Sequence, residues 1–223
     1  AARLERRGDD WYALGADGSA LVSAPVAILA AGAAVRDFAQ AQGLPVVSAR
    51  GQVSLLAAED GSAPRVVVCR GGYVSPAIDG LRCAGATFSV DDDEPSLRSA
   101  DHAENLEKLE AMLPGYASGL APARLGGRVG FRPASPDRLP LVGAVPRAVP
   151  IDPATPLHAI ARVPRLHVMA GFGARGLVWS ALAGELLTSQ LEGDPLPLSR
   201  DLAEAVDPAR FVLRPPSTRG IDE

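Results

Sequence analysis

The sequence contains very little cysteine, histidine or lysine. Its two cysteines, Cys69 and Cys83, are too few for a disulfide-rich scaffold, and with only three histidines they leave few ligands for a zinc site. No apolar stretch approaches the roughly 20 residues that span a bilayer. No basic segment followed by an apolar one opens the chain, as a secretory signal peptide would. We therefore expect a cytoplasmic protein without a metal site and without a membrane contact.

Motifs of several enzyme classes are also missing. The sequence has no G-x-S-x-G, no P-loop and no paired carboxylates of a catalytic kind. These absences argue against a hydrolase or a kinase. The histidines are scattered without ligand spacing, and we interpret all three as structural: His102, His158 and His167.

The composition is that of a globular protein. Hydrophobic residues make up 47% of the 223 positions, which is enough for one large domain or two small ones. Arginine supplies 21 of the 22 basic residues, so the positive charge lies on planar groups that bind carboxylates and phosphates. The net charge of −4 argues against tight nonspecific binding of nucleic acid but leaves a local arginine patch open. Because the chain starts at Ala1 without Met, we expect a piece of a longer protein.

Alternating apolar residues and turn signals predict strands at both ends of the chain, with an antiparallel insertion between them. Residues 2–33 are expected to form a β-meander followed by a strand covered on both faces, Val26–Ala30. The clearest amphipathic helix is 101–113, with Asp101 as its cap. We further expect a short helix near 35–42, a Pro-rich loop from 133 to 150, a helix over 177–191, and strands at 46–56, 65–69, 73–74, 86–90, 127–132 and 165–170.

The strongest local motif is Gly171-Phe172-Gly173-Ala174-Arg175-Gly176. It matches G-x-G-x-x-G, follows an apolar strand and opens a helix, which is the context of a dinucleotide site. The alternative is a tight strand-to-helix turn without a ligand. Only about 30 residues follow the helix, so we interpret this turn as a ligand-facing helix start near the end of a fold, and not as its first βαβ unit.

Two further segments carry arginine. Arg132 ends an apolar strand before a rigid turn, where it could bind a substrate carboxylate; the alternative is an ion pair with a nearby acid such as Asp137. Arg50-Gly51-Gln52 follows Pro45 on a strand that, taken by itself, we expect at the surface.

Four segments, taken in this order, resemble the C-terminal half of flavin-dependent amine oxidoreductases of the D-amino-acid/glycine oxidase superfamily. They are "AILAAGA", "RGQ", "GRVGFRPASPDRLPLVGAVP" and "GFGARGLVWSALAGELLTSQLEGDPLPL". "GATF", "DHAENLEKL" and "DPARFVLR" narrow the resemblance to the oxidoreductase domains of bifunctional tRNA-modifying proteins. The likeness covers roughly residues 2–214.

The resemblance implies an α/β fold, namely the C-terminal half of an FAD-binding Rossmann-like domain with an inserted antiparallel β-sheet substrate domain. Its cofactor-domain segments would be 1–45 and 126–214, its substrate domain 46–125, and 215–223 a flexible tail. The implied reaction is FAD-dependent removal of the carboxymethyl group from 5-carboxymethylaminomethyl-2-thiouridine at the tRNA wobble position. The freed amine would then be methylated with S-adenosylmethionine by a separate domain. That domain and the N-terminal FAD-binding half would be missing partners from the same polypeptide, so this piece alone would be inactive.

The resemblance also assigns site residues. Arg132 would hold the substrate carboxylate, and Arg175 is a second candidate for that task. No cysteine lies near Gly130–Arg132, so FAD would be bound noncovalently. The implied cofactor-binding residues are Ala31, Gly32, Ala33, Arg50, Gly51, Gln52, Gly171, Phe172, Gly173, Ala174, Arg175, Gly176 and Leu177.

Two other functions stay open. One is a small-molecule amine oxidase or dehydrogenase of the same fold, acting on glycine, sarcosine or a D-amino acid. The other is a binding module that has kept the fold and lost the cofactor. A tRNA enzyme needs an open site with an arginine rim, for which the candidates are Arg124, Arg128, Arg138, Arg147, Arg162 and Arg165.

Overall fold

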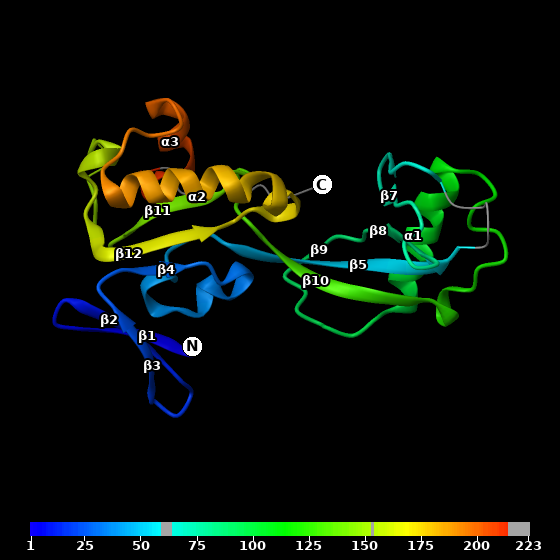
Figure 1. Cartoon of the computed structure of the whole chain (residues 1–223), viewed down its shortest axis with the longest axis horizontal. Helices are drawn as coiled ribbons and strands as arrows, with labels where there is room; N and C mark the ends of the chain where they lie inside the picture. Colours follow the sequence, from blue (N-terminus) through cyan, green and yellow to red (C-terminus); the bar gives the residue numbers. More distant parts are fainter. Residues whose placement is uncertain (59–63, 153, 214–223) are drawn as a thin grey trace. The chain divides into compact units, whose positions relative to one another are not determined.

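Segments from both ends of the chain fold together around an insertion. In the computed structural model, which describes residues 1–58, 64–152 and 154–213, Ala1–Val47 and the described residues between Arg132 and Leu213 form one unit (Figure 1). Ser48–Phe131 form the other. The assignment of 1–45 and 126–214 to the cofactor and of 46–125 to the substrate remains a prediction. The tail expected at 215–223 lies outside the described residues.

The first unit begins with the predicted meander. Its antiparallel sheet has the order β1-β2-β3 and is formed by β1 (Arg3–Arg7), β2 (Asp10–Leu14) and β3 (Ala20–Ala24). On β2, Trp11 is buried, and its Nε1 donates a hydrogen bond to the Pro164 carbonyl at 3.1 Å. This contact fixes the meander to the second sheet of the unit.

That second sheet has the order β11-β12-β4. It contains β11 (Leu141–Pro146), β12 (Arg162–Ala170) and β4 (Ala27–Leu29), and β4 runs parallel to β12 with Leu29 opposite Val168. The expectation that this first apolar strand is covered on both faces is wrong for the described residues. Here β4 is the edge strand, and the side chain of Ile28 is 46% exposed.

The Pro-rich segment 133–150 is also more ordered than predicted, because it contains β11. Its prolines flank the strand and do not interrupt it: Pro140 precedes β11 and Pro146 is its last residue. A proline lacks the N–H that a central ladder position needs, and β11 avoids this cost because it pairs only with β12.

Helices complete the first unit. The predicted helix near 35–42 is two 3₁₀ turns, η1 (Gly32–Asp37) and η2 (Ala39–Ala41), because so short a segment without side-chain caps gains little from α-helical hydrogen bonds. The predicted helix 177–191 is confirmed as α2 (Gly176–Glu192). The other helical segments of the unit are η4 (Leu157–Ala159), η5 (Gly173–Arg175), α3 (Arg200–Val206) and α4 (Arg210–Leu213). α2 and α3 form one apolar cluster with β11 through Ala183, Leu186, Leu187, Ala203, Val206 and Val142.

The second unit is an antiparallel sheet with one long helix, α1 (Ser99–Met112). The sheet order is β10-β5-β8-β7-β6, and β9 pairs with β5. A 3₁₀ turn, η3 (Pro122–Arg124), precedes β10. The strand expected at 86–90 is the shorter β9, while β8 was not predicted. The strands are β5 (Val47–Ala57), β6 (Val68–Cys69), β7 (Tyr73–Val74), β8 (Leu81–Gly85), β9 (Ser89–Val90) and β10 (Gly126–Ala134).

A buried ion pair joins β5 to α1. Arg50 is 0% exposed, so its expected place on a surface strand is wrong. Its Nη1 donates to Asp101 Oδ2 at 2.6 Å, while Nε and Nη2 donate to the carbonyls of Glu94 and Ser96, each at 2.7 Å. Asp101 therefore does not cap α1, which begins two residues earlier, at Ser99.

Further polar side chains extend this contact along the same strand and helix. The Gln52 side chain donates to the Arg98 carbonyl and accepts from the Arg98 amide, both at 2.8 Å. The Ser54 hydroxyl contacts His102 Nδ1 at 2.7 Å and accepts from Asn105 Nδ2 at 3.1 Å. Burial lowers the pKa of His102, although the negative charge of Asp101 raises it, so a neutral ring is favoured. This position fits the structural role predicted for His102, which stays a prediction.

Arg50→Met tests whether this ion pair holds the second unit together. The variant leaves the buried Asp101 carboxylate without its cationic partner and removes the donor of the Glu94 and Ser96 carbonyls, and we expect it to lower the free energy of unfolding by about 3–5 kcal/mol. Urea denaturation followed by circular dichroism measures the loss; both tryptophans lie in the other unit and would not report it.

Arg200→Met is the matched control, because it removes the same charge from an exposed pair with Glu204. Its expected cost is at most about 1 kcal/mol. An equal cost for the two variants would contradict a stabilising role for the buried pair.

Candidate cofactor and substrate site

Two turns of the first unit lie at the same edge of one sheet. Because β4 and β12 are parallel, with Leu29 opposite Val168, the segments that follow them emerge side by side. After β4 comes Ala31-Gly32-Ala33, and after β12 comes Gly171–Leu177. The structure thus brings together two predicted cofactor segments that are 140 residues apart in the sequence.

The backbone of both turns is accessible. Gly32 and Gly173 have left-handed φ angles of +60° and +56°, and a Cβ at either would meet no atom within 4 Å. A left-handed residue with open space beside it is where glycine is favoured, and a flat ligand can approach the peptide groups there closely. The geometry fits a group held by backbone contacts.

The start of α2 adds free hydrogen-bond donors to this edge. No side chain caps its first turn and no acidic residue lies in it, so its leading N–H groups and the positive end of the helix dipole stay available. Leu177 and Val178 in that turn are 97% and 81% exposed. Exposed apolar side chains beside uncapped amides suit a ligand with an aromatic body and polar edges, as an isoalloxazine ring has.

Arg132 lies two residues before a strand position that is bridged to this edge of the sheet. It sits near the end of β10 and is half-buried. Two residues further on, Ala134 forms an antiparallel bridge with Phe172, inside the glycine-rich turn. Asp137, which the sequence offers as an ion-pair partner for Arg132, accepts hydrogen bonds from Arg210 at both carboxylate oxygens, at 2.8 and 2.9 Å. Arg175 is exposed at the start of α2.

The third predicted cofactor segment is placed differently. Arg50-Gly51-Gln52 belongs to the second unit, and its Arg50 and Gln52 side chains are buried in the contact with α1. Those side chains already bond to protein groups, so they are unsuited to contact a cofactor; a contact through this strand's backbone remains a prediction.

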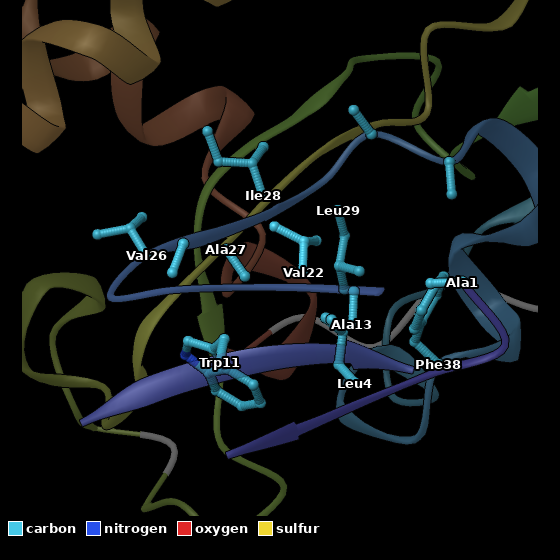
Figure 2. A pocket seen from close by; sticks show the side chains of 13 residues that line it. Ala1, Leu4, Trp11, Ala13, Val22, Val26, Ala27, Ile28, Leu29 and Phe38 are labelled. Carbon is cyan, nitrogen blue, oxygen red and sulfur yellow. The ribbon is translucent and has the colours of Figure 1, made fainter. Parts of the chain in front are cut away.

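An apolar pocket of about 390 Å³ lies beside β4. Figure 2 shows Val22, Ile28 and Leu29 around it, with Trp11 and Leu4 from the neighbouring strands. Its side chains offer no acid, base or amide to orient a reacting group, so the pocket suits packing and does not suit catalysis.

Sequence reasoning missed Arg210 as a residue that supports this edge. Its carboxylate partner lies 73 positions away, so no local spacing could indicate the pair.

Within the described ranges, no cluster of three His, Cys, Asp or Glu could hold a metal ion. No described helix is both long and apolar enough to cross a bilayer.

Known proteins resemble this chain along most of its length. The chain is 63% identical over 213 residues to a tRNA 5-methylaminomethyl-2-thiouridine biosynthesis bifunctional protein MnmC from Aromatoleum aromaticum, covering 96% of this chain and 33% of that protein. A protein of the same name from Burkholderia multivorans is 48% identical, with 96% and 34% covered. The chain therefore spans about a third of the length of these relatives.

Solved structures show the same architecture. Iminodiacetate oxidase (IdaA) from Chelativorans sp. BNC1 superposes with a TM-score of 0.68 at 27% identity, covering 90% of this chain and 51% of that one. Glycine oxidase from Geobacillus kaustophilus gives 0.66 at 18% identity, covering 89% and 49%. The sequence profile of the family "DAO: FAD dependent oxidoreductase" matches residues 1–190, and the chain belongs to this family of FAD-dependent oxidoreductases.

Proposed function

We propose that this chain is part of an oxidoreductase that removes the carboxymethyl group from 5-carboxymethylaminomethyl-2-thiouridine at the tRNA wobble position. The observation that carries the proposal is the high identity to MnmC proteins along almost the whole chain. The product, 5-aminomethyl-2-thiouridine, would be the amine that a methyltransferase domain of the same polypeptide methylates with S-adenosylmethionine. Both tRNA and that domain are proposed partners.

The paired turns would hold FAD. Ala31-Gly32-Ala33 and Gly171–Leu177 offer open backbone, and the α2 N-terminus favours negative charge on the bound group. When bound, FAD would supply a two-electron oxidation of the bond between the amine nitrogen and the carboxymethyl carbon, and water would then hydrolyse the resulting imine and release that group as glyoxylate. The only cysteines, Cys69 and Cys83, both lie in the second unit and far along the chain from these turns, which supports noncovalent binding.

Arg132 would bind the substrate carboxylate. A guanidinium group matches a carboxylate through two parallel N–H donors and so fixes its orientation. Iminodiacetate, named in the IdaA structure, carries a carboxymethyl group on an amine nitrogen, as does the modified uridine. A shared –N–CH₂–COO⁻ group explains how one fold could serve both a small amine and a nucleoside. The same likeness favours a small-molecule amine oxidase as the second candidate.

Flavin reduction distinguishes these two functions. The longer protein that carries this chain is mixed without oxygen with tRNA bearing the carboxymethylaminomethyl group, and separately with glycine or sarcosine. We expect the absorbance at about 450 nm, where oxidised flavin absorbs, to fall with the tRNA alone.

In Arg132→Met, loss of a charge-assisted contact should weaken substrate binding roughly 10- to 100-fold.

Bleaching by the free amino acids alone would overturn the tRNA function in favour of the small-molecule oxidase. A protein that purifies without flavin and binds none on addition would favour a binding module. Arg200→Met serves as the control for a loss of positive charge away from the proposed site.

Phosphate contacts with tRNA would depend on exposed arginines that form no ion pair within the described part of the chain. Arg124, Arg128 and Arg165 are exposed and form no ion pair with a described residue. Arg162, by contrast, donates to both oxygens of Asp207, at 2.7 and 2.9 Å, and is better explained as structural. Of the six rim candidates we therefore retain Arg124, Arg128 and Arg165 as proposed phosphate contacts.

The salt dependence of tRNA binding tests these contacts. Each lost phosphate contact should lower the slope of log K against log salt concentration by about 1 and weaken binding to all sequences alike. We expect this change for Arg128→Met and for Arg165→Met, measured by filter binding between low and moderate salt. An unchanged slope, equal to that of the control Arg200→Met, would remove these residues from the RNA surface.

The open edge of β4 is the proposed contact for the rest of the same polypeptide. A parallel sheet is normally covered on both faces. Val26 and Ile28 are nevertheless exposed, and together with Val22 they line the apolar pocket (Figure 2). The relatives have about two further thirds of chain from which a strand could pair here. Such a strand would extend the sheet and cover the pocket.

Ile28→Lys made in two lengths of protein tests this contact. In the 223-residue chain Ile28 is 46% exposed at the rim of the pocket, so unfolding should change by no more than about 1 kcal/mol. In the longer protein the lysine would be buried, and we expect a loss of about 2 kcal/mol or more with weaker flavin retention. Ile78→Lys, an exposed position in the other unit, is the control. Equal effects in both lengths would contradict a docked strand.

A further inference from the structure

A buried hydrogen-bond cluster fixes the turn that follows Arg132. The Ser135 side chain is fully buried, and its hydroxyl lies 2.5 Å from the Leu139 carbonyl and 3.0 Å from Asp137 Oδ1. The Leu139 amide donates to the same carboxylate oxygen at 3.1 Å. Inside this turn Arg138 has a left-handed φ of +62°, so the turn is held in a conformation that a non-glycine residue rarely adopts.

Arg210 locks this turn from the C-terminal end of the chain. Its Nε and Nη2 donate to the two oxygens of Asp137, and Nη2 also donates to the Leu139 carbonyl at 3.0 Å. The Arg210 side chain is only 12% exposed, and its guanidinium lies over the Phe211 ring, 4.3 Å from the centroid. Burial raises the pKa of Asp137, but the hydrogen bonds from Arg210 and the Leu139 amide outweigh it and lower the pKa overall, so the carboxylate stays charged.

Arg210 is itself held in place by the fold. Its Nη1 donates to the Asp207 carbonyl at 3.1 Å, and the Asp207 carboxylate accepts two hydrogen bonds from Arg162 at the start of β12. Side chains of alternating charge therefore connect β12 to the turn after β10, in the order Arg162, Asp207, Arg210 and Asp137. A two-oxygen contact from a rigidly held guanidinium fixes direction as well as distance.

The locked turn adjoins both parts of the proposed site. Arg132 precedes Ser135 by three residues, and the intervening Ala134 is bridged to Phe172 in the glycine-rich turn. Movement of the 135–139 turn would shift the strand end that carries Arg132 and loosen the bridge to Phe172. Small displacements of a binding group are costly, because oriented contacts lose strength over about an ångström.

We propose that Arg210 is a positioning residue, which through Asp137 holds Arg132 and the Gly171–Gly176 turn in the geometry that binds the substrate carboxylate. This inference rests on the proposed role of Arg132. Arg210 itself contacts neither substrate nor cofactor; it acts by holding the two segments that do.

Steady-state kinetics of the longer protein with carboxymethylaminomethyl-bearing tRNA test the proposal. For Arg210→Met we expect KM to rise about tenfold, the effect of losing one charge-assisted contact, with kcat changed less than twofold. Arg210→Lys keeps the charge but cannot reach both oxygens, so an intermediate increase is expected. Asp137→Asn should raise KM in the same direction, and the double variant should cost less than the sum of the two single variants, because both disrupt the Arg210–Asp137 pair.

Two controls separate positioning from general stability. Arg200→Met removes a C-terminal arginine that pairs only with exposed Glu204, and should leave KM unchanged. All assays are run well below each variant's melting temperature, so that a loss of folded protein does not enter KM. Lower stability with wild-type KM in Arg210→Met and Arg210→Lys would overturn the proposal and leave Arg210 a purely structural residue.

A readout without turnover keeps the proposal testable if the substrate proposal fails. Hydrogen exchange of the Gly171–Gly176 amides should be at least about tenfold faster in Arg210→Met than in Arg200→Met. If the wild-type protein does not oxidise the tRNA while the two variants still differ in exchange, only the proposed substrate is contradicted. Unchanged exchange at these amides would contradict the positioning role itself.

Discussion

The parallel pairing of β4 with β12 is the contact on which the candidate site depends. It aligns two strands from opposite ends of the chain, so that Ala31-Gly32-Ala33 and the Gly171–Leu177 turn emerge at one edge. Together they supply open backbone, helix N–H groups and exposed apolar side chains, and the bridge from Ala134 to Phe172 adds the strand end that carries Arg132.

Buried charge organises both units in different ways. In the second unit Arg50 is completely enclosed and satisfied by Asp101 and two carbonyls, so it fixes α1 against β5. In the first unit Arg210 and Asp137 join the C-terminal segment to the turn after β10. An arginine with several fixed partners orients what it binds, and both pairs connect segments more than 50 residues apart.

Sequence patterns predicted those elements that local interactions favour. The meander, α1 and α2 follow from turn residues, apolar periodicity and an ending glycine, and the structure confirms them within a few residues. Sequence patterns failed where pairing with a neighbouring strand determines whether a segment is a strand. β11 was hidden among prolines, and β8 contains an arginine and a glycine; each is a strand because a neighbour supplies its hydrogen bonds. The same reason explains Arg50, whose burial depends on a helix 50 residues later.

The sequence by itself determined the glycine-rich turn before a helix and the arginine near the end of β10, because each is read from neighbouring residues, and it determined the family through the order of several such segments. Only the tertiary structure decided which of these segments meet. It placed the two turns side by side, enclosed Arg50 and Gln52 within the second unit, and paired Arg210 with Asp137. Hydrogen bonds and ion pairs between distant segments depend on the path of the folded chain, and no spacing along the sequence encodes that path directly.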